Sequence, residues 1–299
     1  MRSIAVLTAL LGTSAALATP IRPSTLLYRR ATPRPENHRL SHAPPPSTHR
    51  PASSFAASVA ADSNPAAESV RGGAALAGQL VGTAVGTFVI PSAEMPTEGP
   101  AGGNVAGLYT ASYWVGIDGA TECVGRASLR AGVDTFWDGG MRSYNAWYEW
   151  YPEPVVDFAN FTVGPGDVVR VTASAGGKGE GEVRMERLAG CGRDAAVLAE
   201  ASMSWSGQEE EDEALCLAEA AWVVEDFSLA SMPGVPVALA NFTAVTFEAV
   251  GAATAEGEKL DLAGARILNI NLEAQGGRLT DCGLEGDARV RCVRTVGGV

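Results

Sequence analysis

The sequence predicts an all-β protein, built as an antiparallel sandwich or jelly roll. From residue 69 onward, short apolar or alternating segments are separated at regular intervals by Gly, Pro, Asn and Asp. Turn signals such as residues 164–167 and 176–179 lie between these segments, and no long stretch shows the periodicity of a helix. Many short strands joined by turns are typical of sandwiches and jelly rolls.

Nine segments are candidate strands because β-branched and aromatic residues are frequent in them or apolar and polar residues alternate. They are residues 83–90, 109–117, 143–151, 168–174, 182–188, 220–227, 244–250, 265–272 and 288–296. The uncharged stretch 72–93 could be mistaken for a membrane span, but glycines interrupt it repeatedly, which favours strands. We therefore expect no membrane anchor.

The first 68 residues have a different composition from the rest. Arg2, a short apolar core and the small residues at 16–18 predict a secretory signal peptide over residues 1–18. Residues 19–68 are rich in Pro, Ser and Ala and cannot bury a core, which predicts a basic, disordered propeptide with Arg29-Arg30 as a candidate processing point. The alternative is a linker that stays attached. The predicted mature domain is residues 69–299, and we expect a secreted, extracellular zymogen.

The predicted mature domain is strongly acidic. Seven of the 22 Lys and Arg residues lie before residue 69, but only three of the 34 Asp and Glu residues do. The domain therefore keeps 15 basic and 31 acidic residues, a net charge of about −16. Such a surface repels nucleic acid and anionic membranes, so we expect neither as a partner.

All three histidines, His38, His42 and His49, lie in the predicted propeptide. Without them, the mature domain has no Ser-His or Cys-His nucleophile and no histidine-ligated zinc. Catalysis would have to use carboxylates, amides, Arg, Lys, Tyr or Cys. We expect no metal and no cofactor.

The cysteines and two glycosylation sequons agree with secretion. Cys282 and Cys292 have the spacing of a local disulfide across a hairpin, and Cys123 and Cys216 could close a long loop, which leaves Cys191 over. Asn160 and Asn241 each begin an Asn-Phe-Thr sequon and are candidate glycosylation sites.

The stretch 221–227, Ala-Trp-Val-Val-Glu-Asp-Phe, carries two carboxylates at the end of a predicted strand. Because side chains alternate along a strand, Glu225 shares a face with Val223 and Phe227, and Asp226 lies on the opposite face. A carboxylate among apolar groups loses hydration, which is typical of a general acid or base. The alternatives are acids that point to water on an edge strand, or a salt bridge within the sandwich.

The densest aromatic cluster is Trp-Tyr-Glu-Trp-Tyr-Pro at residues 147–152. In a strand, Trp147, Glu149 and Tyr151 share one face, and Tyr148 and Trp150 share the other. If one face is core, the second is an exposed aromatic patch of the kind that marks a ligand groove. The alternative is a strand buried on both faces.

Four motifs together resemble the glutamic peptidases, or eqolisins, of filamentous fungi. They are Tyr-Trp-Val-Gly-Ile-Asp-Gly at 113–119, Leu-Arg-Ala-Gly-Val-Asp at 129–134, Ala-Trp-Tyr-Glu-Trp-Tyr-Pro at 146–152 and Trp-Val-Val-Glu-Asp-Phe at 222–227. The motifs match the family in order and spacing, and the resemblance covers the whole predicted mature domain. The resemblance implies a bent β-sandwich related to concanavalin A-like jelly rolls, and a monomeric acid endopeptidase that acts on polypeptides without a metal.

The resemblance also implies roles for single residues. In the family, a Glu acts as general base on water and a Gln amide stabilises the oxyanion. The Glu matches Glu225, which belongs to the same motif as Asp226. The residues that match positions around the family's cleft, and are therefore candidate substrate-binding residues, are Trp114, Asp118, Asp134, Trp147, Glu149 and Asp226.

The sequence departs from the family at the position of the catalytic Gln, where Arg130 stands. Arg71 replaces a cleft tryptophan, and Ser228 and Asn145 each replace an acid. Arg130 could take over oxyanion stabilisation, but pairing with Glu225 would weaken that residue as a base. The alternative function is a non-catalytic homologue that binds peptide or glycan. A lectin-fold glycosidase with Glu149 and Glu225 as its two carboxylates is a third hypothesis.

Overall fold

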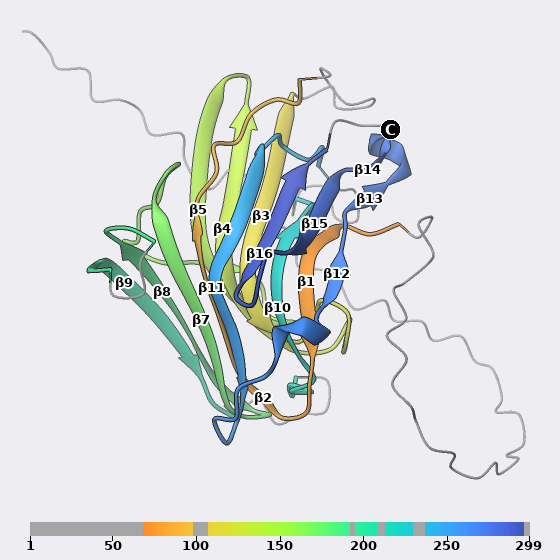
Figure 1. Ribbon diagram of the computed structural model, residues 1–299. Coiled ribbons are helices and arrows are strands. Elements are labelled where there is room, and N and C mark those ends of the chain that lie inside the picture. Colours follow the sequence, from red (N-terminus) through yellow and green to blue (C-terminus); the bar gives the residue numbers. More distant parts are fainter. Residues whose placement is uncertain (1–67, 98–106, 192–194, 208–212, 230–236, 296–299) are drawn as a thin grey trace, which may run out of the picture.

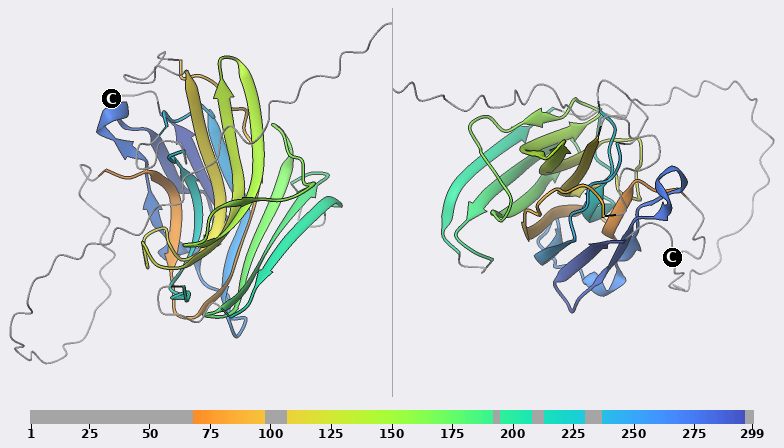
Figure 2. Two further views of the ribbon diagram at one scale, coloured as in Figure 1. Left: turned by 180° about the vertical axis from the view of Figure 1, so that it is seen from behind. Right: turned by 90° about the horizontal axis from the view of Figure 1, so that it is seen from above.

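The protein is described by a computed structural model, in which residues 68–97, 107–191, 195–207, 213–229 and 237–295 are placed. The predicted signal peptide and residues 19–67 of the predicted propeptide lie outside the described residues. The described part folds as two large antiparallel sheets packed face to face (Figures 1 and 2), which confirms the predicted β-sandwich. No helix in the described part of the chain is long and apolar enough to cross a membrane.

The first sheet has the strand order β12-β1-β10-β3-β4-β5-β6. These strands are β12 (Arg266–Leu268), β1 (Arg71–Ala77), β10 (Glu219–Glu225), β3 (Leu108–Ile117), β4 (Ser128–Asp138), β5 (Met141–Tyr151) and β6 (Val156–Asp157). The long strands β3, β4 and β5 curve along their length (Figure 2), so the sheet is bent.

The second sheet has the order β15-β16-β11-β2-β7-β8-β9. These strands are β15 (Thr280–Leu284), β16 (Arg289–Arg294), β11 (Ala244–Thr254), β2 (Val81–Val89), β7 (Val168–Gly177), β8 (Glu180–Leu188) and β9 (Val197–Trp205). A small pair, β13 (Asn271–Leu272) and β14 (Gly277–Arg278), and two 3-10 turns, η2 (Leu262–Gly264) and η3 (Glu273–Gln275), complete the described elements.

All nine predicted segments contain a strand, but the segment 265–272 was predicted wrongly as one continuous strand. It splits into β12 and β13, which belong to different sheets. Strands β4, β9 and β15 and the two-residue strands β6 and β14 were not predicted. In β4 the alternation of Leu129, Ala131 and Val133 is obscured because the intervening residues, Arg130 and Gly132, are buried as well.

The core lies between the two sheets and takes the alternate residues of each strand. On β10 these are Ala220, Trp222 and Val224, which pack among side chains of the second sheet. The indole Nε1 of Trp222 donates a hydrogen bond to the carbonyl oxygen of Val85 across the sandwich, at 2.8 Å. Gly86 makes room for this ring, because a Cβ there would lie 2.9 Å from Cδ1 of Trp222.

The opposite face of the first sheet, here called the outer face, is also buried near its centre. Trp114, Trp147, Ala221 and Val223 form a separate apolar cluster there. The prediction of an exposed aromatic patch on the 147–152 segment was therefore wrong, since Trp147 and Trp150 are buried on opposite faces of β5. The alternative, a strand buried on both faces, is the correct one.

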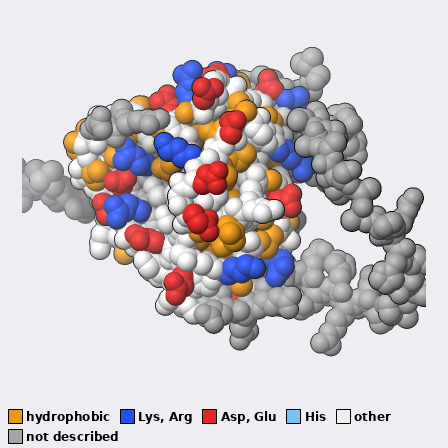
Figure 3. All heavy atoms as spheres, turned by 60° about the horizontal axis from the view of Figure 1, so that its bottom comes forward, with side chains coloured by type: hydrophobic (Ala, Val, Ile, Leu, Met, Phe, Trp, Pro, Cys, Tyr) orange, Lys and Arg blue, Asp and Glu red, His pale blue; other side chains and the backbone are white. Residues whose placement is uncertain are grey.

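The surface mixes charges of both signs on the side of the molecule shown in Figure 3. Acidic and basic side chains are interspersed there with small hydrophobic patches. The acidic excess of the domain is therefore not gathered into one continuous patch on this side.

Candidate active site

Glu225 is the last residue of β10 and lies on the outer face of the first sheet, as the alternation predicted. The strand register places Arg71 of β1 beside it on one side and Ser112 of β3 on the other. Asp134 of β4 continues the same row beyond Ser112. Glu225 is only 3% exposed, so its carboxylate depends on protein partners rather than on bulk water.

Three side chains surround the Glu225 carboxylate. The indole Nε1 of Trp114 donates a hydrogen bond to Oε2 at 2.8 Å. The guanidinium Nε of Arg71 lies 3.4 Å from Oε1, and Nη1 of Arg130 lies 3.8 Å from Oε2. Two cations and an N–H donor favour the ionised form of this carboxylate.

Arg130 is nearly fully buried, at 2% exposure, and is held from two directions. Its Nε donates to Oε2 of Glu149 on β5 at 2.5 Å, and its guanidinium lies over the ring of Trp114, 5.2 Å from the centroid. Among the described residues, its Nη1 has no hydrogen-bond partner. A buried, unpaired donor beside Glu225 is the arrangement that an incoming acceptor oxygen would satisfy.

Two glycines allow these large side chains to lie on the sheet. A Cβ on Gly116 would come within 2.7 Å of Cβ of Arg130, and a Cβ on Gly132 within 2.7 Å of Cβ of Trp114. Trp147 of β5 is paired with Gly132 of β4, and it belongs to the same apolar cluster as Trp114. The predicted residues Glu225, Arg130, Glu149 and Trp114 are therefore in contact through a chain of hydrogen bonds and ion pairs, with Asp134 and Trp147 on the same face.

Arg130 contacts both Glu149 and Glu225, so a guanidinium occupies the space between these two carboxylates. A glycosidase needs its two carboxylates across an open groove that admits the sugar. This arrangement argues against the glycosidase hypothesis.

Asp226 lies on the opposite face from Glu225 and contacts a residue that the sequence analysis missed. Gln275 of η3 donates from Nε2 to Oδ2 of Asp226 at 2.7 Å, and its Oε1 accepts a hydrogen bond from the backbone N–H of Leu239. Burial raises the pKa of Asp226 well above its ordinary value, and the charge of Glu225 acts in the same direction. Asp226 is thus bound to Gln275 rather than to the Glu225 cluster.

Asp118 was predicted to bind substrate, and the contacts of its carboxylate in the structure are with backbone groups. It follows β3, and its carboxylate accepts hydrogen bonds from the backbone N–H groups of Leu217, Ala218 and Glu219. In return, Glu219 accepts hydrogen bonds from the backbone N–H groups of the loop after Asp118, residues 120–122. Glu219 was not predicted from the sequence, and the hydrogen bonds of Glu219 and Asp118 hold the two loops together.

The cysteines pair as their spacing suggested. Cys123–Cys216 joins the two loops that Asp118 and Glu219 hold together, and Cys282–Cys292 links β15 to β16. Cys191 is free and exposed. The sequon residue Asn160 is exposed, whereas Asn241 is half-buried and its Oδ1 accepts a hydrogen bond from the backbone N–H of Thr243.

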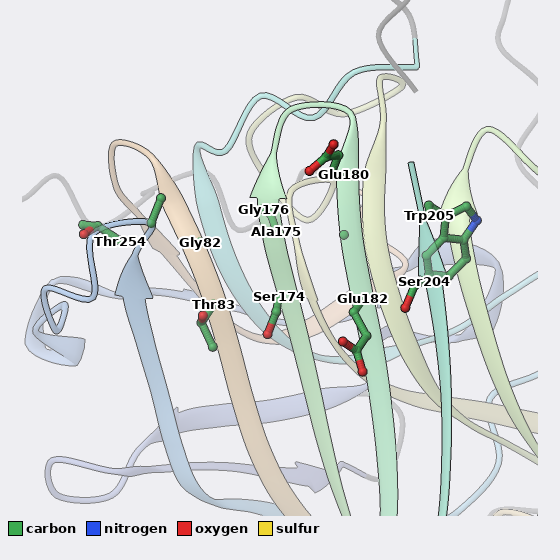
Figure 4. A pocket seen from close by; sticks show the side chains of 12 residues that line it. Gly82, Thr83, Ser174, Ala175, Gly176, Glu180, Glu182, Ser204, Trp205 and Thr254 are labelled. Atoms are coloured by element: carbon green, nitrogen blue, oxygen red, sulfur yellow. The ribbon is translucent and has the colours of Figure 1, made fainter. Parts of the chain in front are cut away.

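Several hollows lie elsewhere, on the second sheet. One, of about 390 Å³, is lined by Thr83, Ser174, Glu180, Glu182 and Trp205 among others (Figure 4). A larger one, of about 580 Å³, lies over β11 and β2. Neither is lined by Glu225 or Arg130, so the candidate site is defined by its chemistry and not by these hollows.

Comparisons with known proteins show which family this chain resembles. The sequence pattern described as the peptidase A4 family matches residues 69–294. Aspergillopepsin-2 of Aspergillus niger is 35% identical over 226 residues, covering 72% of this chain and 74% of that protein. Scytalidopepsin B of Scytalidium lignicola is 32% identical over 222 residues, covering 73% and 75%.

Solved structures of glutamic peptidases are also similar to this chain. Scytalido-glutamic peptidase with a transition state analog inhibitor superposes with a TM-score of 0.61 at 32% identity, covering 76% of this chain and 99% of that one. Aspergilloglutamic peptidase from Aspergillus niger gives a TM-score of 0.52 at 33% identity, covering 62% and 99%. The chain therefore belongs to the peptidase A4 family, the glutamic peptidases.

Proposed function

We propose that this protein is a secreted endopeptidase that hydrolyses polypeptides in acid solution, with Glu225 as the general base. The observation that supports the proposal most is the juxtaposition of Glu225 with Arg130, whose buried Nη1 lies 3.8 Å from the carboxylate and has no hydrogen-bond partner among the described residues. A base and a hydrogen-bond donor side by side are the two groups that water attack on an amide requires.

Glu225 accepts a proton from the attacking water. A carboxylate can do this in acid, where a histidine would already be protonated. Arg71, Arg130 and the Trp114 N–H favour the ionised form of Glu225, so the base persists to low pH. The same partners make it a weaker base, and we expect slow turnover for this reason.

Arg130 donates from Nη1 to the oxygen of the scissile carbonyl as negative charge develops there. It occupies the position at which the family has its catalytic Gln, and its guanidinium stays charged at every relevant pH. Because the group is 2% exposed, its interaction with an oxyanion is screened less by solvent than it would be at the surface. Trp114, Asp134 and Trp147 lie on the same face and are the proposed substrate-binding residues.

A second candidate function is binding of peptide or glycan without hydrolysis. Arg71 favours it, because its Nε is 3.4 Å from Oε1 while Trp114 donates to Oε2. With a cation or a donor at each oxygen, the lone pairs of Glu225 are less available to water.

The test is cleavage of a denatured protein across the acid pH range by the full chain, by Glu225→Gln and by Arg130→Gln. The proposal predicts activity in the wild type and in Arg130→Gln, where a neutral amide replaces the guanidinium, and none in Glu225→Gln. Activity that appears only in Arg130→Gln would support the binding function. Hydrolysis that survives in Glu225→Gln would rule out the proposed base.

Secretion and processing belong to the same proposal. A signal over residues 1–18 and a propeptide over residues 19–68 predict a mature chain that begins near Ser69. N-terminal sequencing of protein recovered from the medium of an expressing fungal culture tests this. An N-terminus within the first 60 residues after acid treatment would contradict the propeptide.

A further inference from the structure

Glu149 is the carboxylate that holds Arg130 in the site. Its Oε2 accepts the hydrogen bond from Nε of Arg130 at 2.5 Å, and both side chains are at most 2% exposed. The other oxygen, Oε1, has no hydrogen-bond partner among the described residues, so Arg130 is the partner that fixes this carboxylate. The two residues face each other across adjacent strands, as the pairing of Arg130 on β4 with Glu149 on β5 requires.

The guanidinium is shared unequally between two carboxylates. The 2.5 Å contact with Glu149 is a short, charge-assisted hydrogen bond, whereas 3.8 Å between Nη1 and Glu225 is too long for one. The Trp114 ring lies beneath the guanidinium and restricts how it can turn, and the same indole donates to Glu225. Arg130 is thus bonded to Glu149 and only close to Glu225.

We infer that Glu149 is a positioning residue that keeps Arg130 from bonding directly to Glu225. The catalytic part of this inference rests on the proposed function. If Glu149 loses its charge, Glu225 is the remaining described carboxylate within 4 Å of the buried Arg130 cation, and a buried cation moves toward its remaining anion. Glu225 would then become a weaker base, and Nη1 would no longer be available to the substrate carbonyl.

Other charged or titratable groups surround this cluster and must stay unchanged in a test. On the outer face these are Arg71 of β1, Asp134 of β4 and Tyr151 of β5, and Asp226 acts on Glu225 from the opposite face. Glu149→Gln leaves these four residues in place. In the Arg130–Glu149 pair it replaces only one carboxylate oxygen by an amide nitrogen. Glu186→Gln is the matched control, because Glu186 also pairs with an arginine, Arg170, but on the second sheet at 3.4 Å.

The direct experiment is a carbon NMR titration of the Glu225 carboxyl in the full chain, assigned by its loss in Glu225→Gln. The inference predicts that Glu149→Gln lowers the titration midpoint by about one pH unit, as expected for a carboxylate that gains a direct cationic partner. Glu186→Gln leaves the midpoint unchanged. In an Arg130→Gln background, adding Glu149→Gln leaves the titration midpoint of Glu225 where it is in Arg130→Gln alone, because the cation that would move is absent.

An unchanged midpoint in Glu149→Gln, or an equal shift with and without Arg130, overturns the inference. If Glu149→Gln does not fold, Glu149→Asp serves instead. It keeps the charge but withdraws the carboxylate by one methylene, and the inference predicts a smaller shift in the same direction.

Kinetics separate this inference from the proposed function. In an active enzyme, Glu149→Gln is expected to lower kcat about tenfold with little change in KM, and to move the acid limb of kcat to lower pH. A midpoint shift without hydrolysis in any variant would retain the positioning role and reject the proposed function. Hydrolysis that depends on Glu225 without a midpoint shift would reject the positioning role alone.

Discussion

Glu219 and Glu225 are the first and last residues of β10, and both are buried on the outer face of the same sheet. Glu219 accepts hydrogen bonds from the backbone N–H groups of residues 120–122 and from the hydroxyl of Thr121. Glu225 is surrounded by the side chains of Arg71, Arg130 and Trp114. One carboxylate is bound mainly by backbone and the other by side chains.

The difference shows that burial alone does not identify a catalytic acid or base. The hydrogen bonds of Glu219 hold two loops together. Its carboxylate could bind a substrate only if these bonds broke and the fold opened. The partners of Glu225 include a donor, Nη1 of Arg130, that has no hydrogen-bond partner among the described residues. We therefore expect changes at the Glu219 end to alter stability and changes at the Glu225 end to alter turnover.

Apart from loss of Glu225 itself, the largest expected effect comes from removing the donor at the Glu225 end. Replacing Arg130 and Glu149 together by Leu removes the cation and its counter-charge, so neither is left unpaired in the interior. Loss of an oxyanion donor should lower kcat by about 100- to 1,000-fold, with little change in the free energy of unfolding. Steady-state kinetics and urea titration measure both.

The matched control for this double variant replaces Arg170 and Glu186 by Leu on the second sheet. That variant should keep the wild-type kcat. A kcat within a few-fold of wild type after removal of Arg130 and Glu149 would contradict the role given to Arg130.

The next effect concerns the disulfide at the Glu219 end. Cys123–Cys216 spans 93 residues, so replacing both by Ser should lower the free energy of unfolding by about 4–5 kcal/mol. The same change at Cys282–Cys292, with a separation of 10, should cost only about 3 kcal/mol. Denaturant titration compares the two, and equal losses would show that loop length does not govern this stabilisation.

Glu219→Gln tests the backbone contacts directly. The amide keeps one acceptor oxygen but turns an N–H₂ group toward backbone donors, so we expect a loss of about 1–3 kcal/mol in the free energy of unfolding. The kcat of the folded protein should stay within a few-fold of wild type. Unchanged stability would show that these hydrogen bonds are replaced by water in the variant.

The smallest effect is a pH dependence of stability. Burial raises the pKa values of Asp118, Glu219 and Asp226 in the folded protein. The folded state then holds more protons than the unfolded state between the ordinary and the raised pKa values. Stability is therefore full below the ordinary pKa values and declines as pH rises through the raised ones.

Melting temperatures measured from acid to neutral pH check this dependence. Asp118→Asn combined with Glu219→Gln should flatten the decline, because two of the three titrating groups are gone. A decline of the same steepness in that variant would assign it to other groups.

Much of the site could be predicted from local sequence. Strand alternation placed Glu225 and Asp226 on opposite faces, and cysteine spacing suggested both disulfides. The contact between Arg130 and Glu149 depends on the register of β4 against β5, which the sequence analysis could not derive because β4 itself was not predicted. Gln275 lies in a 3-10 turn 49 residues after Asp226 in the chain, and no local sequence pattern predicts the contact between them.

The role of Asp118 shows the same limit. Its motif resembles the family pattern, but its hydrogen bonds run to residues about 100 positions later in the chain. The backbone at Asp118 has a positive φ of 64°, which Asp adopts more readily than most residues do. Neither the long-range hydrogen bonds of Asp118 nor its positive φ can be predicted from the local sequence motif.

The central claim is that Glu225, and not the equally buried Glu219, prepares water for attack on the peptide bond. The most direct measurement compares Glu225→Gln with Glu219→Gln in one cleavage assay at acid pH, with each rate normalised to the folded fraction. We predict a loss of about 100- to 10,000-fold in Glu225→Gln and a near wild-type rate in Glu219→Gln. Equal losses in the two variants, or full activity in Glu225→Gln, would contradict the account.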